Sequence, residues 1–261
     1  MTLHEKAKKE LLKDEDFSLI TTDILNEAQH DGNTVWHKAA GFNCLDSIPK
    51  HLFTEESMNL KNQFGKTVLH IAALSSTLED VPKEILTYDS LMQKTNKKQT
   101  VFHFAAVYNT LQYIPKHLFS KEVLSTKDHN LRTVWHLAAA NSTLKDIPVH
   151  LLTQEAFSKA DDSGATAWHW AYSLNNLNDI PDELFTIEAF NQVNNKGISV
   201  WEKMNKRLKE LPCHLITEDL LKMKGSEGKF MFTKDAEYIK SVLSLKKCIY
   251  SQNTPINDFV L

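Results

Sequence analysis

The sequence contains few of the residues that break, kink or cross-link a chain. Its 261 residues include 7 glycines, 7 prolines and 3 cysteines, which excludes a collagen-like protein or a glycine- and proline-rich linker. Cys44, Cys213 and Cys248 show no CxxC spacing and are too few for a disulfide framework or a cysteine-ligated zinc site. We therefore expect reduced thiols in a cytoplasmic protein.

Long apolar runs and a strong charge of one sign are also missing. No stretch of 18 apolar residues occurs, so no membrane-spanning helix is expected. The charged N-terminus lacks the apolar core of a secretory signal peptide. The formal net charge of −3 argues against a dedicated nucleic-acid-binding protein. With 42% hydrophobic and 24% charged residues, the composition is that of a folded globular protein.

Several residue types recur with a period of 33 residues. Five prolines keep this spacing, namely Pro49, Pro82, Pro115, Pro148 and Pro181. A threonine, a large apolar residue, a histidine and a pair of small residues recur with the same period. The histidines of this column are His37, His70, His103, His136 and His169. A fixed period of this length predicts a solenoid of stacked repeats.

Each unit reads as short helices punctuated by capping residues. In the first full unit, Thr34 supplies a helix-capping hydroxyl for a helix over residues 35–42. Leu45 and Ile48 are expected to pack inward. Because a proline disfavours helix at the residue before it, a second, short helix is predicted to start at Pro49 and to run to residue 53. A capped turn begins at Thr54, and a polar Asx-Gly connector follows.

These motifs resemble the ankyrin repeat. Residues 133–139, Thr-Val-Trp-His-Leu-Ala-Ala, are similar to the family signature T-P-L-H-x-A-A. The resemblance covers residues 31–197 well, and residues 1–30 and 198–224 weakly. The sequence departs from the family signature at two positions. Valine or alanine replaces the signature proline, and Pro148 occupies a position in the second helix where the family has no proline. We therefore expect the second helix to be shorter or re-angled. The I-P-x-x-L-[LF]-T form of that helix resembles a bacterial or phage type of repeat.

The resemblance implies an all-α, ankyrin-like helical repeat solenoid of about five full repeats with degenerate caps. We predict a degenerate N-terminal capping repeat over residues 1–30 and five repeats over 31–197. A degenerate sixth repeat follows over 198–224. A C-terminal capping helix and tail occupy 225–261, with the helix itself over 234–249.

The histidine column does not predict a metal site. Equivalent atoms of stacked repeats lie about 10 Å apart, whereas a metal ion needs ligands about 2 Å from one centre. We predict instead that each ring bonds to the column threonine or to nearby backbone. A second column, of His51, His117, His150 and His214, is expected on a half-exposed helix face. No P-loop, GxGxxG, GxSxG or HExxH motif occurs, so we predict no catalytic residue, no metal and no cofactor.

The candidate partner-binding residues are those that vary between repeats. They follow the alanine pair or flank the turn glycine, and the resemblance implies that such positions line the concave face and finger tips. The predicted set is Phe42, Phe64, Lys66, Lys97, Gln99, Tyr108, Arg132, Asn141 and Leu174. Phe42, Phe64, Tyr108 and Leu174 are the apolar anchor candidates. Lys97 and Arg132 are expected to steer an acidic partner. The tryptophans of the large apolar column are assigned to the core, and the off-column Trp170 is the tryptophan expected to be exposed.

We expect a non-catalytic scaffold, monomeric on its own, that binds a partner protein of unknown identity and no membrane. The bacterial or phage type of repeat points to one version of this function, an effector or inhibitor of a host protein. Such an effector would act in the host-cell cytosol. The alternative is a nucleic-acid-binding module that uses the basic band from Lys94 to Arg132.

Overall fold

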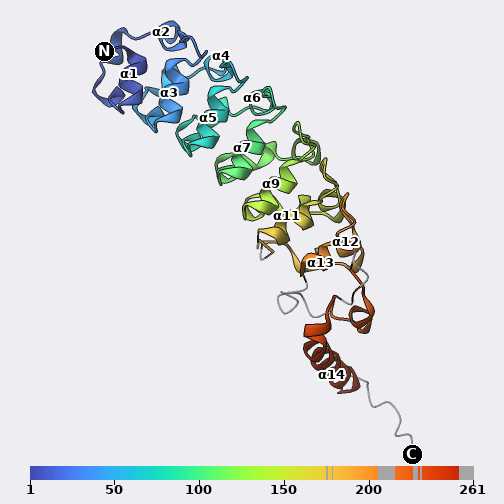
Figure 1. Cartoon of the computed structure of the whole chain (residues 1–261). Helices are drawn as coiled ribbons and strands as arrows, with labels where there is room; N and C mark the ends of the chain where they lie inside the picture. The colour runs from blue at the N-terminus through green and yellow to red at the C-terminus, as the bar shows by residue number, and fades with distance from the viewer. Residues whose placement is uncertain (175, 178, 205–214, 226–228, 230, 253–261) are drawn as a thin grey trace, which may run out of the picture.

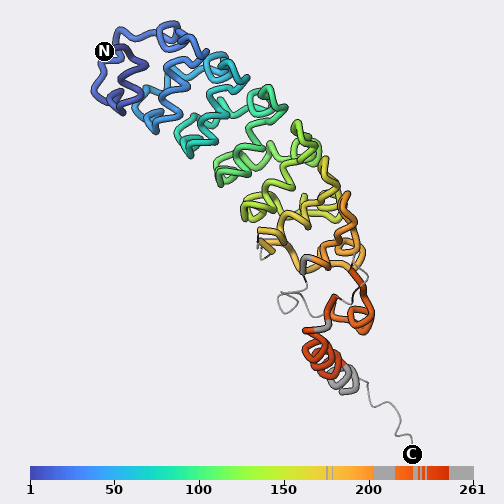
Figure 2. Tube along the Cα trace, in the orientation of Figure 1, coloured from blue at the N-terminus to red at the C-terminus, as the bar shows by residue number. Residues whose placement is uncertain are grey.

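The computed structural model describes residues 1–252 except 175, 178, 205–214, 226–228 and 230. Throughout this part the regular secondary structure is helical, joined by three isolated β-bridges at the turns between repeats. The helices stack into a curved solenoid (Figure 1). The Cα trace passes through the repeats in chain order, so that each repeat lies beside its sequence neighbours (Figure 2).

Every full repeat begins with a seven-residue α-helix. These helices are α3 (Val35–Gly41), α5 (Val68–Leu74), α7 (Val101–Val107), α9 (Val134–Ala140) and α11 (Ala167–Ser173). The helices α1 (Leu3–Lys8) and α13 (Val200–Met204) occupy the equivalent places at the ends. Thr34 caps α3 as predicted, because its hydroxyl accepts a hydrogen bond from the backbone N–H of His37. Neighbouring helices of this row pack directly against one another.

The second half of each repeat differs from the predicted helix at the proline. 3₁₀ turns lie before and after Pro49, Pro82, Pro115 and Pro148, and one turn follows Pro181. They are η3 (Leu45–Ser47), η4 (Lys50–Leu52), η5 (Leu78–Asp80), η6 (Lys83–Ile85), η7 (Leu111–Tyr113), η8 (Lys116–Leu118), η9 (Leu144–Asp146), η10 (Val149–Leu151) and η11 (Asp182–Leu184). The predicted helix start at Pro49 is therefore wrong. Ile48 and Pro49 are both extended, with ψ of 129° and 134°, because the proline ring excludes helical geometry at the residue before it.

A short α-helix closes each repeat where the capped turn was predicted. These helices are α2 (Thr22–Asn26), α4 (Glu55–Asn59), α6 (Tyr88–Leu91), α8 (Lys121–Leu124), α10 (Gln154–Phe157) and α12 (Ile187–Asn191). Thr54 caps α4 by accepting from the backbone N–H of Ser57. In Figure 1, the row from α1 to α11 follows the inner side of the bend, and α2, α4, α6 and α12 follow the outer side. We call these the inner row and the outer row.

The core runs between the two rows through the whole stack. Trp36, Trp135, Trp168 and Trp201 are fully buried, as the periodic column predicts. Aromatic rings of the outer row meet them edge-on, such as Phe190, whose centroid lies 5.2 Å from that of Trp168 and 5.1 Å from that of Trp201. The paired small residues let neighbouring inner helices approach closely. The core is therefore one continuous cluster along the solenoid rather than a central ball.

The histidine column joins each repeat to the next. The Nδ1 atom of His136 accepts a hydrogen bond from the Thr133 backbone N–H at 3.1 Å and lies 2.8 Å from its hydroxyl. The Nε2 atom lies 3.2 Å from the carbonyl oxygen of Ala165, in the turn of the following repeat. The predicted bond to threonine is confirmed, and the structure adds the bridge across the repeat boundary. Burial lowers the pKa of His136, so the ring stays neutral with its proton on Nε2.

A second polar ladder was not predicted. The buried hydroxyls of Thr77, Thr110 and Thr143 donate to carbonyl oxygens 37 residues earlier, at the ends of the preceding inner helices. Their acceptors are Ala40, Ala73 and Ala106. The last carbonyls of an α-helix lack partners within the helix, and these threonines satisfy one in each repeat.

The end segments lie at opposite ends of the stack (Figure 1). At the N-terminus, His4 lies 3.0 Å from the Glu27 carbonyl oxygen, a shortened version of the histidine bridge. At the other end are η14 (Glu218–Lys222), η15 (Thr233–Asp235) and α14 (Ala236–Gln252), the last covering most of the helix predicted over residues 234–249. Parts of the predicted sixth repeat and tail lie outside the described residues. Within the described residues, no helix has the length and apolar character needed to cross a bilayer.

Candidate partner-binding site

The turns before α5, α9 and α11 are built on a buried Asx side chain, Asn62, Asp128 or Asp161, whereas Thr95 takes this place before α7. Asp128 Oδ1 accepts from the backbone N–H groups of Asn130 and Arg132, both at 2.9 Å. Asn62 does the same for Phe64 and Lys66, at 3.0 and 3.1 Å. These bonds fold the connector into a tight turn, in which the two residues that donate their backbone N–H groups follow the Asx residue at two and four positions. The turn therefore positions Phe64 and Lys66 side by side at the edge of the inner row.

The central residue of this turn needs a left-handed backbone. Gly65 has a φ of 69°, and a Cβ atom there would lie 2.5 Å from the side-chain oxygen of Asn96 in the next turn. Lys98 and Leu131 occupy the same turn position in the next two repeats with φ values of 58° and 56°. The turn geometry is thus kept in repeats that have no glycine, at the expense of backbone strain.

A cavity of about 500 Å³ opens on the inner row between α5, α7, α9 and their turns. Six of the nine predicted partner-binding residues line this central cavity, namely Phe64, Lys66, Lys97, Gln99, Tyr108 and Arg132. Phe64 and Tyr108 are 57% and 43% exposed, so two aromatic side chains present apolar surface at the cavity. The variable positions of separate repeats thus converge on one hollow.

Part of the cavity wall is formed by residues outside the predicted set. Phe104 and Leu137, which immediately follow the column histidines, also line the central cavity, with Leu74 and Val107 beside them. The signal was available, because the position after the histidine varies as freely as the predicted ones, reading Lys38, Ile71, Phe104, Leu137 and Trp170. This position lies inside a helix whose other positions are fixed by packing, so its variation alone does not distinguish it from a core position.

Three predicted residues lie outside the central cavity. Phe42 follows α3 and is exposed. Asn141 follows α9, and its side-chain amide donates to the carbonyl oxygen of Leu137, which caps the helix end. Leu174 is exposed and lines a second cavity of about 440 Å³ beside α11, together with Trp170. We call this the distal cavity.

Lys66 and Arg132 each lie over an aromatic ring of the next repeat. The Lys66 ammonium is 5.3 Å from the centroid of Phe104, and the Arg132 guanidinium is 5.9 Å from that of Trp170. A cation at this distance is attracted by the negative face of the ring. Trp170 is consequently half-buried rather than exposed, and its Nε1–H donates to Asp161 at 2.9 Å.

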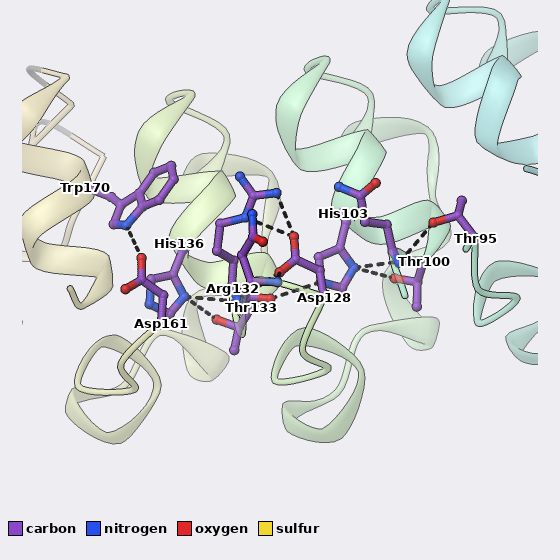
Figure 3. A network of polar contacts seen from close by, with 11 residues as sticks. Thr95, Thr100, His103, Asp128, Arg132, Thr133, His136, Asp161 and Trp170 are labelled. Atoms are coloured by element: carbon purple, nitrogen blue, oxygen red, sulfur yellow. Dashed lines mark hydrogen bonds and ion pairs between the residues drawn. The ribbon is translucent and has the colours of Figure 1, made fainter. Parts of the chain in front are cut away.

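The two cations differ in how their charge is balanced. Arg132 donates from Nε and Nη2 to Oδ2 of buried Asp128, at 2.9 and 2.7 Å, in the network drawn in Figure 3. Lys66 and Lys97 form no ion pair with any carboxylate among the described residues. Burial, followed by the nearby charge of Lys97, lowers the pKa of Lys66. The central cavity therefore carries positive charge that no carboxylate of the described residues compensates.

The basic band does not form one surface. Lys97 belongs to an inner-row turn, whereas Lys116 on η8 and Lys121 on α8 belong to the second half of the repeat. Lys116 donates to the carbonyl oxygen of Asp146, and Lys121 pairs with Glu155 at 3.1 Å. The cations that the sequence grouped between Lys94 and Arg132 thus lie on different parts of the solenoid, several with partners of their own.

Other sequence candidates lie apart from the cavities. His51, His117 and His150 are exposed on the 3₁₀ turns after the prolines rather than on a helix face, and His214 lies outside the described residues. Within the described residues, no three His, Cys, Asp or Glu side chains converge as metal ligands. Cys44 is a buried free thiol whose pKa burial raises to about 11. Cys213 and the side chain of Cys248 lie outside the described part of the structure.

Comparison with proteins of known structure identifies the fold. No protein-family model and no curated protein sequence matches the chain. Among solved structures, it is similar to the ankyrin repeat domain of Bcl-3, a member of the IkappaB protein family, with a TM-score of 0.54 and 17% sequence identity. That match covers 82% of this chain and 100% of the Bcl-3 domain.

A second match comes from the complex of the predatory endopeptidase Bd0816 of Bdellovibrio bacteriovorus with the immunity protein Bd3460. Its TM-score is 0.48 at 23% identity, over 68% of this chain and 94% of that one. The Bcl-3 likeness agrees with the 33-residue period, the T-V-W-H-x-A-A motif and the stacked helices. The chain therefore has the ankyrin repeat fold.

Proposed function

We propose that this chain is a non-catalytic scaffold that binds a partner protein through its inner row and the adjoining turns, with the central cavity as the main contact. The observation that carries the proposal is the convergence of exposed aromatic residues and unpaired cations on one hollow. Phe64 and Tyr108 come from different repeats, yet line the same space as Lys66 and Lys97. Aromatic side chains dominate the energetics of protein interfaces, and charged side chains beside them steer a partner of opposite charge.

The polar groups of the described core favour binding over catalysis. Each ring of His70, His103 and His136 uses both nitrogens in hydrogen bonds within the solenoid, and burial holds their pKa values below the usual range. Such a ring is a poor general base, because neither nitrogen is free to take a proton. The raised pKa of Cys44 keeps that thiol protonated and therefore unreactive.

The proposal includes a monomeric scaffold in the cytoplasm. The free, buried thiol of Cys44 fits a reducing compartment. If the repeat type reflects a bacterial or phage origin, the partner is a host protein that the chain occludes as an effector or inhibitor. A nucleic-acid partner is disfavoured, because the cations of the basic band lie on different parts of the solenoid.

The test is capture of the partner by paired variants. Immobilised wild-type protein, Phe64→Ser/Tyr108→Ser and the control Val149→Ser are exposed to native lysate, and bound proteins are identified by mass spectrometry after cross-linking. Val149 is an exposed apolar residue on η10, away from the central cavity. The wild type and the control should capture the same protein, and the cavity variant should lose it. Capture that survives the double substitution, or recovery of nucleic acid alone, would overturn the proposal.

A further inference from the structure

The central and distal cavities are built from equivalent positions two repeats apart. Phe104 and Tyr108 line the central cavity, and Trp170 and Leu174, each 66 residues later in the sequence, line the distal one. The solenoid therefore presents the same kind of apolar hollow twice on its inner row.

The cation over the ring repeats with the same 66-residue spacing. Lys66 covers Phe104, and Arg132 covers Trp170. In the repeat between them, the corresponding positions hold Gln99 and Leu137, which are neither a cation nor an aromatic ring. The pairing thus alternates along the stack. Lys66 and Phe104 both line the central cavity, whereas Arg132 lines the central cavity and its partner ring Trp170 lines the distal one.

The cations that line the central cavity differ in how their charge is balanced, and among the described residues the distal cavity is lined by a single cation, Lys196. Arg132 is neutralised by Asp128 before any partner arrives. Lys66 is half-buried beside Lys97, and neither has a carboxylate partner among the described residues. A half-buried ammonium next to a like charge is stabilised by an anion placed between them. The apolar wall of Phe104 and Tyr108 lies next to this position.

We propose that the partner presents an acidic segment with two apolar side chains, one for each cavity, and that a carboxylate beside the first pairs with Lys66 and Lys97. This inference rests on the proposed function and adds the chemistry of the partner. Adjacent repeats lie about 10 Å apart, so the two apolar side chains are about 20 Å apart. An extended chain covers that distance in about six residues, and a helix in about thirteen.

A phage-displayed library of random peptides tests both parts of the inference. Peptides about 16 residues long accommodate two anchors in either conformation. Wild-type protein should enrich peptides with Asp or Glu next to a large apolar residue, and with a second apolar residue at one of the two spacings. Lys66→Glu/Lys97→Glu should reverse the preference to Lys or Arg, and Leu174→Ser should remove the requirement for the second apolar residue.

Matched controls separate this inference from the proposed function. Lys66→Met/Lys97→Met keeps the aliphatic part of each side chain. This variant should lose the preference for acidic peptides while its circular dichroism spectrum stays unchanged. Lys83 is exposed on η6, and Lys83→Glu should enrich the same peptides as the wild-type protein. If the enriched peptides depend on Tyr108 for binding but contain no preferred acidic residue, only the inference about charge would be overturned. Enrichment with no fixed second apolar residue would overturn the two-cavity inference. Peptides that bind equally to Phe64→Ser/Tyr108→Ser, or no enrichment at all, would overturn the proposed function as well.

Discussion

The Nε2 atom of His37 lies 3.1 Å from the carbonyl oxygen of Lys66, one repeat further along the chain. His70 and His103 make the same contact with Gln99 and Arg132, at 3.1 and 3.4 Å. All three acceptor residues line the central cavity. The periodic histidines, which look purely structural, thus hold the backbone of three cavity residues in place.

Acid should destabilise the fold through these histidines. Burial lowers the pKa values of His37, His70 and His103 to about 4, against about 6.5 in the unfolded chain. Between about pH 4 and about pH 6.5 the unfolded state binds more protons than the folded state. The stabilisation from the neutral histidines is therefore fully present above about pH 6.5 and is lost as the pH falls towards about 4. The loss should be on the order of 3 kcal/mol per histidine. Urea midpoints across this pH range measure it. His70→Gln should flatten the profile, and an unchanged slope would contradict the assignment.

His136→Ala should destabilise the protein without weakening partner binding at the central cavity. The substitution leaves the buried Thr133 N–H and Ala165 carbonyl groups without their partner, which costs about 2–4 kcal/mol for the two groups. This exceeds the value expected from a single bond to threonine. Urea denaturation and partner affinity are measured on the same preparation. Normal stability with abolished binding would show that the ring has a direct role at the interface.

Trp135 should tolerate phenylalanine but not alanine. Trp135→Ala should cost about 3–5 kcal/mol, because it opens a cavity in the continuous core. Its buried Nε1–H has no hydrogen-bond partner, and Phe102 fills the same column one repeat earlier. Trp135→Phe should therefore cost less than about 1.5 kcal/mol. Thermal melts of both variants measure this difference. An equal loss of stability in the two variants would refute the prediction.

Thr110→Val should destabilise by about 1–3 kcal/mol, because the isosteric side chain leaves the buried carbonyl of Ala73 unsatisfied. Thr110→Ser keeps the hydroxyl and serves as the matched control. Chemical denaturation of both variants gives the comparison. If valine is neutral, the threonine ladder makes no net contribution to stacking.

Tyr108→Ala combined with Lys97→Glu should lower the affinity for the captured partner at least tenfold, equivalent to about 1.4 kcal/mol. Both side chains are exposed, so the melting temperature should stay near that of the wild type. Arg132→Glu is a poor substitute, because it places a carboxylate beside buried Asp128 and should lower stability too. Isothermal titration measures the affinity. A double variant that binds normally would move the interface away from the central cavity.

Much of the architecture was determined by the sequence alone. The 33-residue columns predicted the solenoid, the caps at Thr34 and Thr54, and the burial of the tryptophan column, because each depends on local capping chemistry or on strict periodicity. Pro49 signalled an irregular second half, but local rules could not show that 3₁₀ turns would replace the helix there. Six cavity residues were also found from variation between repeats, although their contact with a partner stays a prediction.

Only the tertiary structure decided which of these residues act together. The stacking of repeats brings Lys66 over Phe104 and Arg132 over Trp170. Arg132 pairs with Asp128, whereas Lys66 and Lys97 have no carboxylate partner in the described part of the chain. The Thr110 ladder and the histidine bridges likewise join residues 37 and 29 positions apart. A column identifies equivalent positions in different repeats, but the curvature and spacing of the stack determine which side chains meet across a boundary and which charges remain unpaired.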